Sequence, residues 1–109
     1  MAYDESLAAR VRDELTPHGN VTERKMFGGL AFMIAGNMCC GVTGSDLMLR
    51  LGDGADAALE DPHVRPMDFT GRPLSGFVYV APEATAKTPD LRRWIGSALV
   101  FVSTLPPKG

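Results

Sequence analysis

The sequence predicts an α+β fold, a two-layer sandwich in which a mostly antiparallel five-stranded sheet carries helices on one face. Three observations lead to this prediction. Apolar residues recur with a helical period near both ends of the chain, short runs with strand character fill the middle, and turn residues separate those runs. The expected order of elements is α-β-β-β-α-β-β-α.

Composition and charge limit the classes of protein to consider. The chain has 109 residues, of which 45% are hydrophobic and 22% charged, and this is typical of one globular domain. We therefore take residues 1–109 as a single domain with an ordered core over residues 4–105. The net charge of −2 disfavours direct binding to nucleic acid. Because the sequence shows neither a secretory signal nor a long apolar span, we expect a cytoplasmic protein without membrane contact.

The first half of the chain is expected to form a helix and then a three-stranded meander. A helix over residues 4–16 would gather Leu7, Ala8, Val11 and Leu15 on one face. The strands that follow are expected at 26–34, 38–42 and 47–51.

The next part of the chain predicts a short helix and a pair of strands. Asp53 is placed to cap the helix, which ends before Pro62. The two strands are expected at 64–69 and 74–80. Pro66 predicts that the first of them lies at a sheet edge, because proline cannot donate a ladder hydrogen bond.

The final helix has the clearest pattern in the sequence. Thr88 is expected to cap it and Pro89 to occupy its first position, and it should extend to about Thr104. Its apolar stripe comprises Leu91, Trp94, Ile95, Ala98, Leu99 and Val102.

The sequence contains more apolar residues than a sheet covered by helices on one side requires. The strand at 26–34 is apolar on both faces, and the last helix has apolar residues outside its main stripe. Because large apolar patches usually mark interfaces, we expect a homodimer, although loops covering these residues are an alternative. The candidate self-association residues are Met26, Phe32, Met33, Val100 and Phe101.

The only cysteines, Cys39 and Cys40, are adjacent. Neighbouring side chains of a strand point to opposite faces, so the two sulfurs are not expected to share a metal ion. A zinc site needs about four ligands, and only His18 and His63 could join, without ligand spacing. We expect two reduced thiols and no metal or cofactor, with reversible oxidation as the one functional alternative.

A small group of cations stands beside turn residues. Arg24 and Lys25 precede the pair Gly28-Gly29, which lacks the spacing of a nucleotide-binding loop. These glycines are expected to permit a bulge or a close backbone approach. Together with Arg72 they form a candidate surface for a partner or an anion, and separate solvated cations are the alternative.

Two segments resemble a known family. Residues 24–30 (RKMFGGL) and 69–80 (FTGRPLSGFVYV), with the tryptophan-bearing last helix, resemble the N-terminal domain of the TfoX/Sxy competence regulators. The resemblance covers residues 7–105. It implies an α+β fold like that of secretion chaperones, a role in transcriptional co-regulation, and no catalytic residues. The competence regulators add a C-terminal helical domain, so we expect a stand-alone N-terminal domain here. The thiol pair departs from the family pattern.

The sequence contains no pattern of nucleophile and base or of paired carboxylates that would indicate catalysis. We therefore expect a non-enzymatic regulatory or adaptor domain that binds another protein. Two alternatives remain open. One is a weakly nucleic-acid-associated transcription regulator that uses Arg24, Lys25, Arg72, Arg92 and Arg93. The other is a small-molecule binding module with a pocket between helix and sheet.

Overall fold

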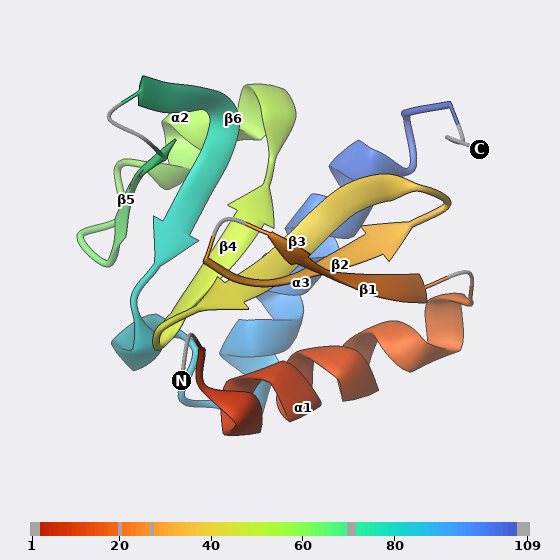
Figure 1. Ribbon diagram of the computed structural model, residues 1–109. Coiled ribbons are helices and arrows are strands. Elements are labelled where there is room, and N and C mark those ends of the chain that lie inside the picture. Colours follow the sequence, from red (N-terminus) through yellow and green to blue (C-terminus); the bar gives the residue numbers. More distant parts are fainter. Residues whose placement is uncertain (1–2, 20, 27, 70–71, 107–109) are drawn as a thin grey trace.

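In the computed structural model, which describes residues 3–19, 21–26, 28–69 and 72–106, one antiparallel sheet is packed against helices (Figure 1). The side chains of Phe69, Arg72 and Pro73 lie outside this description. The α-helices are α1 (Glu5–Leu15), α2 (Ala55–Ala58) and α3 (Thr88–Val102). The strands are β1 (Val21–Met26), β2 (Gly29–Ile34), β3 (Asn37–Thr43), β4 (Asp46–Arg50), β5 (Val64–Phe69) and β6 (Arg72–Val80). Short 3₁₀ turns are η1 (Thr16–His18), η2 (Gly52–Gly54) and η3 (Pro82–Ala84).

The sheet confirms the predicted α+β class. Its strands follow the order β1-β2-β3-β4-β6-β5, and every neighbouring pair is antiparallel. Helix α3 packs on β3 and β4, and α1 packs on β3 and α3, so these two helices share one side of the sheet (Figure 1). Strand β5, which contains Pro66, lies at an edge as predicted. None of the helices in the described parts of the chain is long and apolar enough to cross a membrane.

The sheet has six strands where the sequence predicted five. The additional strand is β1, which pairs in full with β2 and ends where Met26 faces Gly29. Gly28 lies between them with φ +72°, a backbone angle that glycine adopts without strain. The expected single strand at 26–34 is therefore wrong at its start. Strand β1 escaped prediction because it is an edge strand whose polar residues give no apolar alternation.

Two predicted helix caps are also wrong. The structure begins α3 at Thr88 itself, after the capping residue Lys87, and no side-chain cap bond is present there. Asp53 lies inside η2, and α2 follows it without a side-chain cap. The clear cap is on α1, where the carboxylate of Asp4 accepts hydrogen bonds from the backbone N–H groups of Ser6 and Leu7 at 2.9 and 3.2 Å.

Two ion pairs attach α1 to its neighbours. The guanidinium of Arg12 donates to both carboxylate oxygens of Glu23 on β1, at 2.5 and 2.8 Å. Arg92 on α3 donates to Glu14 at 2.9 and 3.3 Å. These hydrogen bonds lower the pKa of both carboxyl groups. Because the pairs lie at the surface, each contributes little to the stability of the fold. One pair connects α1 to the edge strand β1 and the other connects it to α3.

Gly29 marks a close approach between β2 and β3. An added Cβ there would overlap the carbonyl oxygen of Val42, which confirms the predicted role of this glycine in a close backbone approach. We expect Gly29→Ala to destabilise the protein by about 1–3 kcal/mol, the range for an overpacked site.

Gly96→Ala is the matched control for that substitution. Its Cβ would meet no atom within 4 Å, and its position inside α3 predicts a gain of about 1 kcal/mol. Urea unfolding followed by circular dichroism measures both variants. A Gly29→Ala protein as stable as the wild type would contradict the close approach.

Candidate functional site

The sheet carries apolar side chains on both faces, and the two sets form separate clusters. The larger cluster lies between the sheet and the helices and includes residues of α1, α3 and every strand from β2 to β6. The smaller one contains no helical residue and lies on the opposite side, which we call the outer face. Its buried members are Ala31, Met33, Met38, Met48 and Met67, and partly buried around them are Met26, Leu74, Phe77 and Tyr79.

The outer face holds every methionine of the chain after Met1. Met48 and Met67 are fully buried, and Met33 and Met38 are only 7% and 5% exposed. Gly41 makes room for this packing, because a Cβ on it would collide with the Cε of Met48. The methionines therefore form a deformable layer beneath the surface, and the accessible apolar area comes from the half-buried residues around them.

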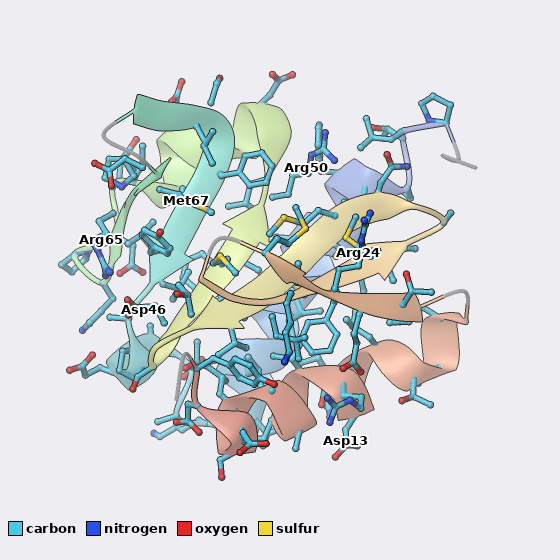
Figure 2. The ribbon with its side chains drawn as sticks, viewed as in Figure 1. Asp13, Arg24, Asp46, Arg50, Arg65 and Met67 are labelled. Atoms are coloured by element: carbon cyan, nitrogen blue, oxygen red, sulfur yellow. The ribbon has the colours of Figure 1, made fainter. Side chains whose placement is uncertain are left out.

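Arginines border the outer face. Antiparallel partners project to the same side of a sheet, and the register places Arg24 opposite Ala31, Arg50 opposite Phe77 and Arg65 opposite Tyr79. Figure 2 shows these three arginines and Met67 over the sheet, whereas Asp13 lies away from them on α1.

Two of these arginines are held by neighbouring groups. The guanidinium of Arg65 lies 4.7 Å from the centre of the Tyr79 ring and donates to Asp46 at 2.5 Å. Burial raises the pKa of the Tyr79 hydroxyl above its ordinary value of 10.0. Arg50 lies over the ring of Phe77 at 5.5 Å. Arg50 and Arg65 therefore stack on aromatic residues of this face, and Asp46 balances the charge of Arg65.

The predicted anion surface is only partly assembled. Arg24 and Lys25 are neighbours on β1 and are both exposed, but the register turns Arg24 to the outer face and Lys25, opposite Leu30, to the helix side. Gly28 forms a turn and Gly29 the close strand approach. The side chain of Arg72 lies outside the described residues. Arg24 is thus the member that joins the outer face.

The candidate self-association residues lie in three different places. Phe32 is fully buried against the helices and belongs to the core, so it offers no contact surface. Met26 and Met33 belong to the outer face. Phe101 is half-buried, and its ring occupies the space that a Cβ atom on Gly52 would need. Val100 is 71% exposed and is the one large hydrophobic residue reported as exposed in the described part of the chain.

A β-bulge places both cysteines on one side of the sheet. Phe32 pairs with Cys40 but the next residue, Met33, pairs with Met38, so Cys39 is an extra residue on β3. Both thiols are fully buried in the helix-side cluster. The expectation that alternation separates the two sulfurs is therefore wrong. A hydrogen bond with Cys39, together with burial, raises the pKa of Cys40 well above its ordinary value.

This environment predicts thiols that do not react in the folded protein, because the thiolate is the nucleophile. We expect a disulfide reagent such as DTNB to label neither cysteine until denaturant is added. Since the folded-state pKa of Cys40 is raised, its contribution to stability is complete below the ordinary value of 9.0. That contribution is lost as pH rises further, because the unfolded chain ionises first.

Unfolding in urea at pH 7 to 10 measures that loss, and Cys40→Ala should make the alkaline decline shallower. Rapid labelling of the native protein would contradict the burial of the two thiols.

The sequence did not predict that Arg50, Arg65 and the methionines lie on the same face of the sheet. The alternation of Leu47, Met48 and Leu49 carried part of the signal, because it put a methionine on the face away from the leucines. The positions of the other residues on this face depend on the bulge at Cys39 and on the pairing of β4 with β6. Alternation along a single strand indicates neither of these.

Taken together, the described residues define an α+β domain with an arginine-bordered apolar sheet face. Within them there is no group of three or more His, Cys, Asp or Glu side chains that could hold a metal ion. The chain belongs to the TfoX N-terminal domain family, whose model matches residues 13–102. This match confirms the resemblance drawn from residues 24–30 and 69–80. No curated protein and no solved structure matches the chain.

Proposed function

We propose that this domain is a non-enzymatic cytoplasmic regulator that acts by binding another protein through the outer face. The observation that carries the proposal is the second apolar cluster, which no helix in the described residues covers. Membership of the TfoX N-terminal domain family supports a regulatory role like that of the competence regulators.

The chemistry of the outer face favours a particular kind of partner. Methionine side chains repack around different shapes, and arginine and aromatic residues are enriched among the residues that dominate binding energy. The partner should therefore bring apolar side chains to Phe77, Tyr79 and Met26, with carboxylates near Arg24 and Arg50.

The test uses two adjacent residues that receive the same change of charge. Arg24→Glu acts on the outer face, whereas Lys25→Glu acts on the other side of the same edge strand. Both side chains are exposed, so both variants should fold. In capture of tagged protein from native cytosol, with mass spectrometry of what co-elutes, we expect Arg24→Glu to lose a specific partner.

Lys25→Glu should retain that partner with an affinity close to wild type. The loss for Arg24→Glu should reach about tenfold or more, as for a charged contact that becomes repulsive. Equal recovery by both variants would contradict binding at the outer face. Retention of DNA that weakens in both variants and falls with salt would instead support the nucleic-acid alternative.

We propose further that the protein forms a homodimer through α3. Next to the exposed Val100, a mostly apolar groove of about 430 Å³ runs between the end of α1 and α3, with Pro17, Ile95 and Leu99 in its walls. In a two-fold dimer the same patch lies on both subunits, so Val100 of each subunit would fill the groove of the other.

We expect sedimentation equilibrium to show a dimer for the wild type and a monomer for Val100→Lys, because the dimer would bury two uncompensated charges. Ser103→Lys adds the same charge just beyond α3 and should leave the dimer intact. The measurement covers a 100-fold range of concentration that extends to about 0.1 mM, where even a weak dimer forms. A wild-type protein that remains monomeric at the highest concentration would contradict this proposal.

A further inference from the structure

The two edges of the sheet differ in how they are protected against a further strand. An open edge presents unpaired backbone groups, and proteins usually block it with proline, a bulge or charge. The edge strand β5 contains Pro66, and its register with β6 is irregular between Pro66 and Asp68. The other edge strand, β1, contains no proline and pairs with β2 from Val21 to Met26 without a break in register. Its backbone is therefore regular enough to receive another strand.

The backbone groups of every second residue of β1 point away from the sheet. Residues that flank a two-residue hairpin loop exchange backbone hydrogen bonds, and the pairs beyond them alternate. Met26 and Gly29 flank such a loop, so the backbone of Met26 is directed to β2. Val21, Glu23 and Lys25 consequently direct their N–H and carbonyl groups outward. Within the described residues, no backbone hydrogen bond beyond the sheet satisfies these three.

A groove beside β1 leaves room for the side chains of a further strand. Its volume is about 300 Å³, and its walls are Val21 and Glu23 of β1 together with Arg12, Thr16 and Gly19 at the end of α1. All residues of β1 except the first and the last are exposed. Figure 1 shows β1 at the outside of the sheet, with α1 along its helix side. The edge is therefore accessible both at its backbone and at the side chains beside it.

Charge decides which strand fits this edge. Glu23 is already paired with Arg12. Among the described side chains, no carboxylate lies within ion-pair distance of Arg24 or Lys25. These two cations face opposite sides of the sheet. A strand with an acidic residue opposite each of them would therefore neutralise both.

The same charges exclude a second copy of β1 as the occupant. Opposite residues of an antiparallel pair face the same side of the sheet, and residues with outward backbone groups must pair with each other. A two-fold pairing over most of β1 is therefore centred on Glu23 or on Arg24. Either centre places two like charges directly opposite each other, which is destabilising. The edge is thus suited to a strand of different sequence.

We propose that β1 binds an acidic extended segment of another protein as a seventh strand. The segment runs antiparallel to β1, since antiparallel pairing is the more stable per residue, and the outward backbone groups of β1 supply its hydrogen bonds. Two successive acidic residues lie opposite Lys25 and Arg24. One apolar residue packs beside Met26 on the outer face, and another enters the groove beside Val21. The expected sequence is apolar-acidic-acidic-x-x-apolar.

The probe is the acetylated and amidated octapeptide TVEETTVT, whose two glutamates fall opposite Lys25 and Arg24 in antiparallel register. In ¹H–¹⁵N spectra of the full chain, we expect the largest shifts and slowed hydrogen exchange at the amides of Val21, Glu23 and Lys25. The charge-reversed peptide TVKKTTVT should bind at least about tenfold more weakly, because like charges then face each other. No response of these amides at peptide concentrations up to about 5 mM would overturn the proposal, as would equal binding of the two peptides.

Two N-methylated forms of the acidic peptide test the backbone pairing directly. Methylation of the fifth residue, opposite Glu23, removes an N–H that donates to the edge. Methylation of the fourth residue, opposite Arg24, removes an N–H that points to solvent and is the matched control. The first peptide should lose binding, and the second should bind like the unmodified one. Equal binding of both would overturn the proposal, because side-chain attraction alone would then hold the peptide.

Three protein variants separate the edge from the outer face. Lys25→Glu should lose the peptide and retain the outer-face partner, whereas Arg24→Glu should weaken both. Lys87→Glu makes the same change of charge at an exposed position before α3 and should bind the peptide like the wild type. Unchanged peptide binding by Lys25→Glu, or an equal loss in Lys87→Glu, would overturn the edge proposal. If the peptide binds but no protein partner is captured, the outer-face proposal alone fails.

Discussion

The structure depends on one constraint: a six-stranded sheet must bury apolar side chains on both of its faces. On one face α1 and α3 supply the cover, and Phe32, Leu49 and Ile95 are completely or almost completely buried there. On the other face the sheet supplies its own cover from methionines. Long, unbranched methionine side chains can lie flat across neighbouring strands, and this explains how Met48 is fully buried without a helix above it.

The β-bulge in the β2–β3 hairpin sets which residues reach each face. Without the extra residue at Cys39, the register of β3 would advance by one, and a shift of one residue exchanges the two faces of a strand. The bulge allows Cys39 and Cys40 to enter the helix-side core together while Met38 remains on the outer face. The turn beyond it, at Ala35 and Gly36, has positive φ at both residues, as a two-residue hairpin loop requires.

The sequence contains the signals for most elements but few for how they combine. Helix α3, the edge position of Pro66 and the α+β class follow from period and turn chemistry, and all three are confirmed. Strand β1 could not be predicted in this way, because its strand character comes from pairing with β2 and from the ion pair of Glu23 with Arg12. The outer face could not be predicted either. Its residues come from all six strands, and only the register and the bulge bring them to one side.

The outer face and the helix-side core meet at one short segment. Arg50 ends β4 and stacks on Phe77, and it also lies 5.8 Å from the centre of the Phe101 ring on α3. The next residue, Leu51, belongs to the helix-side core, and its backbone N–H donates to the carbonyl of Gly76 at 2.8 Å. A substitution at Arg50 would therefore disturb both sides of the sheet at once, whereas Arg24 on the edge strand β1 faces the outer side alone.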